Sequence, residues 1–254
     1  MKGILTSILI VFVITSFAIA QEQYHGANTA IEETSTGPLA VTPVYHGSVM
    51  FEWNGKVVHV DPWSQGDYSD KPKADLILIT HQHRDHLDIP LIEKLSKEGT
   101  VLGVTATVAE QLAGHEWSSE PNYKLMAYGD SGEFHGISVK AVPAYNLLRE
   151  RSPGVKFHPR GEGNGYVLTF ADKTVYVAGD TELIPEMKAL KGIDIAFLPC
   201  NLPYTMTVEE AAEAARTLKP AIFYPYHYRG AEVSKLKELL ADVPEIEVRI
   251  ADIY

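Results

Sequence analysis

The residues of this sequence with the clearest capacity for chemistry lie in one short segment, THQHRDHLD at positions 80–88. His81 and His83 are two residues apart, so both imidazoles point to the same side if the segment is extended. These two rings can hold one cation, and Asp85 with His86 can hold a second cation beside it. Neutral imidazole nitrogens and carboxylate oxygens are ligands of zinc in catalytic sites, which leave one position open for water. The segment therefore predicts a metal site.

An apolar run, ADLILI at positions 74–79, directly precedes this segment and is typical of a strand buried on both faces. The alternative for positions 80–88 is a solvated loop that happens to be rich in histidine and aspartate. The place of these residues at the end of a buried strand favours the metal site.

The rest of the chain must supply the framework that positions this segment. The predicted elements begin with β-hairpins, marked by the turn signal Asn54-Gly55, and then alternate between strands and helices in each half. The strongest predicted helix spans positions 208–218, because Thr207 and Glu210 can form a capping box at its start. This order predicts one α/β domain over residues 39–254, with two mixed β-sheets flanked by helices.

Residues 1–38 are expected to lie outside that domain. Residues 1–20 have the pattern of a signal peptide, with a positive start, an apolar run and small residues before the cleavage point. Residues 21–38 are polar and aperiodic, which predicts a flexible leader. We therefore expect an exported protein, periplasmic or extracellular, with no stable membrane insertion after signal cleavage. An uncleaved membrane anchor is the alternative, although hydroxyl residues interrupt the short apolar run.

The net charge of the chain indicates which classes of binding partner are unfavourable. Its 254 residues include 22 Lys+Arg and 33 Asp+Glu, which give a formal net charge of −11. This acidic balance disfavours nucleic acid and anionic lipid as partners, so we expect a small-molecule substrate. Cys200 is the single cysteine, which excludes an internal disulfide and a cysteine-rich zinc knuckle.

The pattern H-x-H-x-D-H at positions 81–86 resembles the signature of the metallo-β-lactamase superfamily and matches it in full. The resemblance extends from about Leu39 to Tyr254. Within the superfamily, VPAYN at 142–146 and MTVEEAAEAARTLKP at 206–220 are similar to metal-dependent hydrolases of the L-ascorbate-6-phosphate lactonase type. The resemblance implies an αββα four-layer sandwich, with the site along one edge between the sheets.

The same resemblance implies roles for residues that follow other predicted strands. Asp61, in HVDP, is similar to an aspartate that orients a metal ligand rather than binding the metal. Asp180, in GDT, is similar to the bridging aspartate of the family, and His227, in PYH, to its last histidine ligand. His46 resembles a recurring position near the site, but it is not expected to bind metal.

The sequence departs from the family pattern at the third histidine of the first metal site. Asn146 stands there, and an amide is a poor zinc ligand beside imidazole. We predict that His158, on the following loop, replaces this ligand and that Asn146 holds a water or substrate. Tyr145 and Tyr204, in loops after strands, are candidates for contact with substrate. The alternative is that His158 is an ordinary loop histidine and that the first site is weak or empty.

Together these features predict an exported hydrolase that uses two zinc ions, with manganese as an alternative metal. A water shared by the two ions would have a pKa of about 7, and the resulting metal-bound hydroxide would attack an ester, lactone, amide or phosphodiester. Asp85 and Asp180 are the expected catalytic residues, which orient the hydroxide and pass a proton to the leaving group. A non-catalytic metal-binding domain with a degenerate first metal site is the alternative function.

Overall fold

Residues 28–115 and 123–254 are described in the computed structural model. The predicted signal peptide and residues 21–27 of the predicted leader lie outside these ranges. Within them, no helix has both the length and the apolar character needed to cross a membrane.

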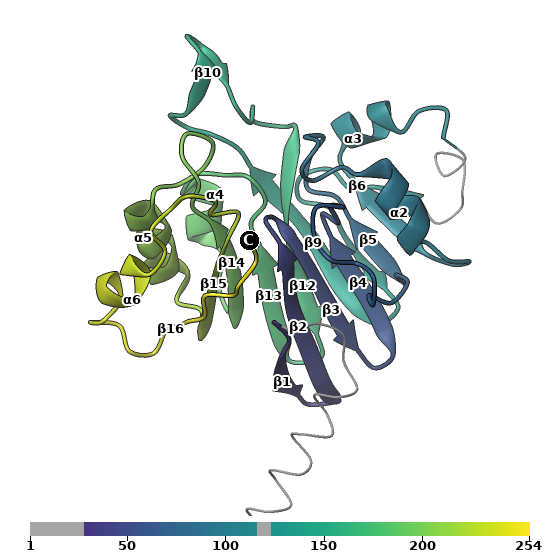
Figure 1. The fold of residues 1–254 in the computed structure, drawn as a ribbon, viewed down its shortest axis with the longest axis horizontal. Coiled ribbons are helices and arrows are strands. Elements are labelled where there is room, and N and C mark those ends of the chain that lie inside the picture. Colours follow the sequence, from purple (N-terminus) through teal and green to yellow (C-terminus); the bar gives the residue numbers. More distant parts are fainter. Residues whose placement is uncertain (1–27, 116–122) are drawn as a thin grey trace, which may run out of the picture.

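Seven strands in chain order form the first sheet (Figure 1). They are β1 (Ala30–Thr34), β2 (Gly37–Tyr45), β3 (Ser48–Trp53), β4 (Lys56–Val60), β5 (Leu76–Leu78), β6 (Val101–Val104) and β7 (Tyr123–Leu125). The first four strands pair antiparallel, whereas β4 to β7 pair in parallel. The predicted hairpin turn between β3 and β4 is confirmed, because Asn54 and Gly55 both have positive φ values, 48° and 71°.

The second half of the chain forms another seven-stranded sheet, in the order β16-β15-β14-β13-β12-β9-β8. Its strands are β8 (Ser131–Phe134), β9 (Ile137–Ala144), β12 (Gly163–Phe170), β13 (Lys173–Val177), β14 (Ile195–Pro199), β15 (Ile222–Tyr226) and β16 (Glu247–Val248). This sheet is also antiparallel from β8 to β13 and parallel from β13 to β16. Two further strands, β10 (Glu150–Ser152) and β11 (Val155–Lys156), form a hairpin that projects from the body of the molecule (Figure 1).

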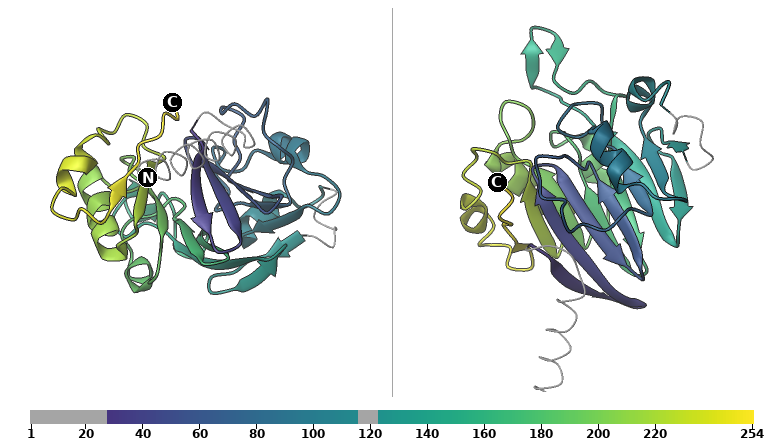
Figure 2. Two further views of the ribbon diagram at one scale, coloured as in Figure 1. Left: turned by 90° about the horizontal axis from the view of Figure 1, so that it is seen from below. Right: turned by 45° about the vertical axis from the view of Figure 1, so that its right-hand side comes forward.

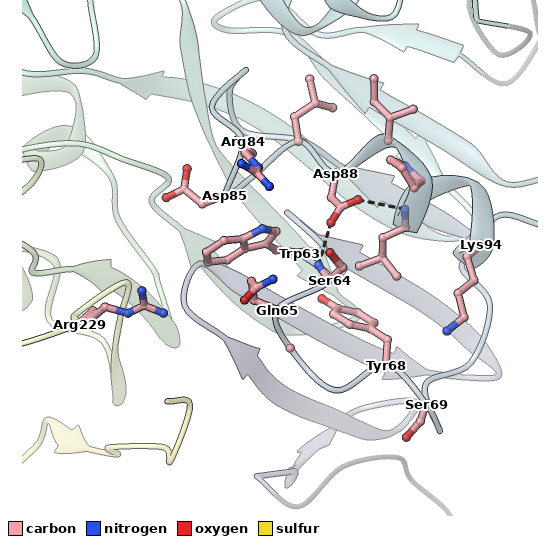
Figure 3. A pocket seen from close by; sticks show the side chains of 15 residues that line it. Trp63, Ser64, Gln65, Tyr68, Ser69, Arg84, Asp85, Asp88, Lys94 and Arg229 are labelled. Carbon is pink, nitrogen blue, oxygen red and sulfur yellow. Dashed lines mark hydrogen bonds between the residues drawn. The ribbon is translucent and has the colours of Figure 1, made fainter.

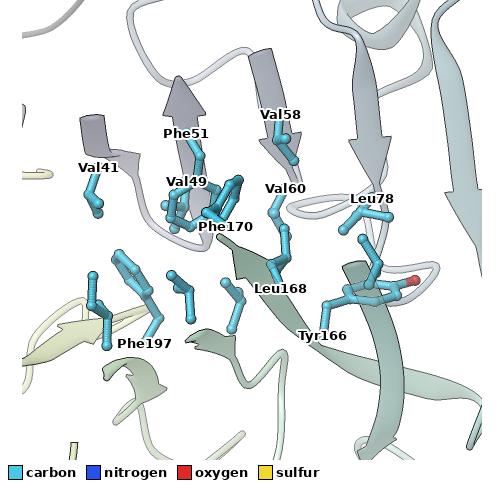
Figure 4. Close-up of a cluster of buried hydrophobic side chains, with 14 of the residues drawn as sticks. Val41, Val49, Phe51, Val58, Val60, Leu78, Tyr166, Leu168, Phe170 and Phe197 are labelled. Carbon is cyan, nitrogen blue, oxygen red and sulfur yellow. The ribbon is translucent and has the colours of Figure 1, made fainter. Parts of the chain in front are cut away.

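The two sheets pack face to face, and apolar side chains from both fill the space between them (Figure 4). The ring of Phe51 on β3 lies 5.5 Å from that of Phe170 on β12 and 6.1 Å from that of Phe197 on β14. Burial of each side chain of this kind stabilises the fold by roughly 1.5–3 kcal/mol. The core therefore holds the two sheets in a fixed relation to each other.

Helices cover the outer faces of both sheets. The first sheet carries α2 (Ile89–Leu95) and α3 (Ala106–Gln111). The second sheet carries α4 (Pro185–Ala189), α5 (Val208–Leu218) and α6 (Lys235–Leu239), which lie together on the side away from the purple strands in Figure 2. The predicted αββα four-layer sandwich of two mixed sheets is confirmed.

The structure corrects the predicted flexible leader over residues 30–38. These residues form β1 and the start of β2, and β1 pairs antiparallel with β2 along its whole length. Trp53 Nε1 also donates a hydrogen bond to Thr34 Oγ1 at 3.2 Å. Main-chain hydrogen bonds to β2 hold this edge strand, and neither of its faces is deeply buried. Its sequence is therefore polar and lacks the alternation of apolar residues by which strands are predicted.

Replacing Thr207 with alanine should lower the free energy of unfolding by about 1 kcal/mol, because it removes the N-cap of α5. The predicted capping box is present: Thr207 Oγ1 accepts the Glu210 N–H at 3.0 Å, and the Glu210 carboxylate accepts the Thr207 N–H at 2.8 Å. Thr217→Ala is the control, since that hydroxyl donates to a carbonyl of the same helix. Urea denaturation measures both variants, and equal losses of stability would contradict the prediction.

Candidate metal centre

The predicted ligands lie at one edge of the sandwich, where strands end. Residues 81–86 follow β5, Asp180 follows β13 and His227 follows β15. Because β4 and β5 are parallel, and β13, β14 and β15 are parallel, their carboxyl ends meet at this edge. The fold thus brings three distant stretches of the chain together.

Three histidines form one potential metal-binding group. The ligand atoms of His81, His83 and His158 all lie within 4.8 Å of one another. His81 Nε2 and His83 Nδ1 are 3.0 Å apart. His158 reaches the group from the loop after β11, and the structure therefore places it where the missing third histidine is expected.

The Asp180 carboxylate lies at the centre of the cluster. Its Oδ2 is 3.2 Å from His158 Nε2 and 3.3 Å from His227 Nε2, and its Oδ1 is 3.5 Å from His86 Nε2. One carboxylate therefore contacts histidines from three segments, which is the arrangement that a bridging ligand requires.

Asp61 orients two of the histidine rings. Its Oδ2 accepts hydrogen bonds from His86 Nδ1 at 2.8 Å and from the Thr80 hydroxyl at 2.6 Å. Because the Thr80 hydroxyl donates to Asp61, it accepts from His81 Nδ1, which lies 3.0 Å away. The Nε2 lone pairs of His86 and His81 are thereby left to face the cluster, as metal-ligating histidines require.

The structure corrects the predicted role of Asn146. Its Oδ1 accepts the His158 backbone N–H at 2.7 Å and lies 2.9 Å from His158 Nδ1, while its Nδ2 donates to the Tyr204 carbonyl at 2.8 Å and to Glu182 at 3.2 Å. These protein contacts occupy the amide, so it does not hold a water or substrate. Asn146 instead fixes the His158 tautomer with its proton on Nδ1, which leaves Nε2 toward Asp180.

His46 lies beside the cluster, in the turn between β2 and β3. Its Nε2 is 3.1 Å from Asp85 Oδ2 and its Nδ1 is 2.8 Å from the Tyr254 hydroxyl. The Tyr254 oxygen already accepts the backbone N–H groups of Tyr228 and Arg229, at 2.9 and 3.0 Å, so its own proton is free to be donated to His46 Nδ1. His46 therefore carries its proton on Nε2 and donates it to Asp85. In this tautomer His46 supports Asp85, and His46, Asp85 and His227 also have ligand atoms within 4.8 Å of one another.

Several buried atoms of the cluster have no hydrogen-bond partner among residues 28–115 and 123–254. They include His86 Nε2, Asp180 Oδ1 and His227 Nε2. Buried polar atoms are normally paired, and unpaired ones commonly mark a place for a water or an ion. Imidazole nitrogens and a carboxylate oxygen that meet without partners fit a divalent cation.

The electrostatics of the cluster also favour a cation. Burial and the imidazole of His86 hold the pKa of His81 well below its usual value, so this ring is neutral near pH 7, as metal binding requires. At His86, burial disfavours the imidazolium, but the carboxylates of Asp180 and Asp61 outweigh burial and raise the pKa to about 10. The cluster therefore attracts positive charge, which a bound metal ion would supply.

A cleft of about 530 Å³ opens beside the cluster. His83, His158, Asp180 and His227 form one part of its lining, and Tyr204 lines it as well, where it can contact a substrate. The lining does not include Tyr145, and the structure corrects that candidate. The Tyr145 hydroxyl donates to Glu186 at 2.9 Å and its ring packs among the buried residues beneath α4 and α5.

A family model described as a beta-lactamase superfamily domain matches residues 40–227. The chain belongs to the metallo-β-lactamase superfamily. It is 32% identical over 198 residues to a UPF0173 metal-dependent hydrolase from a Geobacillus species, and this match covers 75% of this chain and 85% of that protein. A crystal structure from Parabacteroides distasonis, of a protein assigned by name to the metal-dependent hydrolases, matches with a TM-score of 0.80 and 43% identity, over 89% of this chain and 99% of that one. A metallo hydrolase from Ignicoccus hospitalis shares the fold, with a TM-score of 0.68 and 24% identity over 85% of this chain and 95% of that one.

The residues that orient the histidine rings, Thr80 and Tyr254, were not predicted from the sequence. Thr80 precedes the motif and carries no signal beyond its place in it. Tyr254 is 208 positions from His46, and no local pattern connects two residues so far apart. Gly47 is the one sequence signal beside His46: a Cβ at this position would lie 2.8 Å from His86 Cε1, so the site requires a glycine there.

Asn146→Ala should weaken zinc binding by about 10- to 100-fold, because His158 loses the acceptor that fixes its tautomer. Competition with a chromogenic zinc chelator measures the affinity. Asn201→Ala is the matched control, since Asn201 lines the cleft but makes no hydrogen bond to the described histidines. If the two variants bind zinc equally well, Asn146 does not orient a ligand.

Tyr254→Phe should also weaken metal binding, by about tenfold, because His46 Nδ1 loses its donor and the proton on Nε2 is no longer fixed toward Asp85. Tyr228→Phe removes a hydroxyl that donates to the Ala251 carbonyl and is the control. The same chelator competition, together with the histidine NH signals in the NMR spectrum, separates the two variants. Retention of the His46 Nε2–H signal in Tyr254→Phe would contradict this assignment.

Proposed function

We propose that this protein is a metal-dependent hydrolase that acts on an ester, lactone, amide or phosphodiester bond of a small molecule. The observation that carries the proposal is the meeting of Asp180 with six other donor residues at one edge of the sandwich, where buried donor atoms lack a hydrogen-bond partner in the part of the chain that the structure describes. The relatives named as metal-dependent hydrolases support it. Two zinc ions are the proposed cofactor, with manganese as the alternative, and the similarity to the lactonase type remains a prediction.

The residues divide into those that would hold the metal and those that would move a proton. His81, His83 and His158 would hold one ion, and Asp85, His86 and His227 the other, with Asp180 between them. When bound, divalent ions lower the pKa of a coordinated water to about 7 and polarise the bond to be cleaved.

Asp85 and Asp180 differ in their access to the cleft. The side chain of Asp85 is 34% exposed, whereas that of Asp180 is 4% exposed. Burial alone would raise the pKa of Asp180, but the imidazoles of His227 and His86 outweigh it and hold the pKa well below its ordinary value. Burial would raise the pKa of Asp85 as well, but hydrogen bonds with His227 and His46 outweigh it and hold that pKa far below its ordinary value. Both carboxylates therefore suit charged ligands, and the greater exposure of Asp85 suits it to orient a water in the cleft and to pass its proton toward a leaving group.

We also propose that the protein is exported to the periplasm or the cell exterior. The support is the pattern of residues 1–20 in the sequence, which lies outside the described structure. A small-molecule substrate, no nucleic-acid partner and no stable membrane insertion after cleavage belong to the same proposal and agree with the net charge of −11.

Removal of metal tests the proposal directly. Dialysis against a chelator should abolish turnover and lower the melting temperature, because ions that bind only the native state stabilise it. Added zinc should restore both properties. Metal content per chain is measured alongside a panel of lactone, ester, phosphodiester and β-lactam substrates. Stoichiometric metal without turnover on any of them would favour the non-catalytic metal-binding domain, and a protein that binds no added zinc would contradict both functions.

Asp85→Asn should reduce kcat by about 100-fold or more, because the amide can neither carry the negative charge nor accept a proton. Asp242→Asn is the control, since that carboxylate is exposed and pairs with Arg216 on the surface. Steady-state kinetics of the zinc-loaded variants gives the comparison. A rate near that of the wild type for Asp85→Asn would remove Asp85 from the mechanism.

A further inference from the structure

The arginines of this chain fall into two groups. Four of the seven form ion pairs with carboxylates away from the metal cluster, namely Arg149, Arg160, Arg216 and Arg249. Arg84, Arg151 and Arg229 have no carboxylate within 4.0 Å in residues 28–115 and 123–254. Each of these three lines a cleft that Asp85 also lines. The uncompensated guanidinium groups are therefore concentrated beside the metal cluster.

Two clefts meet at this place. The cleft beside the metal cluster contains Arg151 and Arg229, and a wider, more open one contains Arg84 and Arg229. Trp63, Asp85 and Arg229 line both of them, so the two are continuous. Figure 3 shows the Arg229 side chain pointing toward Trp63 from the opposite side of the wider cleft.

The Arg229 guanidinium is held by aromatic groups instead of a carboxylate. It lies 5.8 Å from the centre of the Tyr45 ring and 5.4 Å from that of Tyr254, and it donates to the Tyr45 hydroxyl. These contacts fix the position of the positive charge without neutralising it.

Arg151 lies on the projecting β10–β11 hairpin. Its Nε donates to the Lys156 carbonyl at 3.3 Å, which leaves its terminal nitrogens available to a ligand. Acidic residues outnumber basic ones in this chain, which has a net charge of −11, so two arginines without a carboxylate partner beside one cleft are a notable feature of the described residues. A guanidinium binds carboxylate and phosphate groups through two parallel hydrogen bonds, which suits both arginines to an oxyanion.

We propose that the substrate carries an oxyanion group, carboxylate or phosphate, separate from the bond that is cleaved, and that Arg229 and Arg151 bind this group. Arg84 adds positive charge at the wide end of the cleft. Trp63, Phe157 and Tyr204 line the same space and would cover the organic part of the molecule. This inference rests on the proposed hydrolytic function and names its class of substrate.

Three 4-nitrophenyl esters that differ only at the far end of the acyl chain test the proposal on the zinc-loaded full-length protein. One ends in a free carboxylate, the second in a phosphate monoester and the third in a neutral methyl ester. The wild type should hydrolyse at least one charged ester with a kcat/KM about tenfold or more above that of the neutral ester, chiefly through KM. The charged ester that is preferred identifies carboxylate or phosphate as the anion.

Arg151→Gln and Arg229→Gln should each lower the ratio of charged to neutral kcat/KM by about tenfold, and Arg229→Lys should lower it less. Arg216→Gln is the matched control, because Arg216 is paired with Asp242 outside the cleft. A ratio near one in the wild type, or a ratio that the two glutamine variants do not change, would overturn the proposal.

A direct binding measurement separates this inference from the hydrolytic function. Isothermal titration calorimetry of succinate and of inorganic phosphate is carried out on the zinc-loaded wild type and the Arg151→Gln/Arg229→Gln double variant. A loss of affinity of about tenfold or more in the double variant supports the oxyanion site even if none of the esters is hydrolysed. Equal affinities in the two proteins would overturn the site, whether or not the protein is a hydrolase.

Discussion

The metal cluster depends on the buried carboxylate of Asp61. This residue directly follows β4, is fully buried and accepts three hydrogen bonds, from the Thr80 N–H at 2.7 Å, the Thr80 hydroxyl at 2.6 Å and His86 Nδ1 at 2.8 Å. A carboxylate buried without such partners costs several kcal/mol, so the segment that begins at Thr80 must stay where it supplies them. Asp61 lines neither cleft, yet it sets the direction of His86 directly and of His81 through Thr80.

Three residues at this edge of the sandwich have a strained backbone conformation. His46, Asp61 and His227 have φ values of 53°, 47° and 46°, a left-handed conformation that costs a non-glycine residue about 1–3 kcal/mol. The neighbouring contacts must outweigh that cost. One of them joins the two sheets, since the His227 N–H donates to the His46 carbonyl at 2.8 Å. The strained residues therefore lie where the two halves of the chain are locked together, which keeps ligands from both sheets in register.

Local pattern predicted the parts of the structure that local forces decide. The buried strand before the motif, the Asn54-Gly55 turn and the capping box at Thr207 each depend on residues close in sequence. The direction and contacts of single side chains were harder to predict, as the neighbours Tyr145 and Asn146 show. Asn146 is turned inward by His158, whereas Tyr145 is turned away from the cleft by Glu186. Both partners are distant in sequence or on another element, so the periodicity of the strand gave no information about them.

Two opposite electrostatic environments lie side by side at this edge. The aspartates and the ligand nitrogens of the histidines favour cations in the cluster, while the arginines without a carboxylate partner leave positive charge in the cleft. Tyr254 connects the two: its hydroxyl lies 2.8 Å from His46 Nδ1 and accepts the Arg229 N–H at 3.0 Å, and its ring lies 5.4 Å from the Arg229 guanidinium. Tyr254 therefore contacts both Arg229 of the proposed anion-binding site and His46, which supports Asp85. Because two backbone N–H groups hold the Tyr254 hydroxyl, the fold fixes the position of this side chain between His46 and Arg229. If the proposed oxyanion site holds the substrate, such a cleft would select substrates by the length that separates their anionic group from the bond to be cleaved, in addition to their charge.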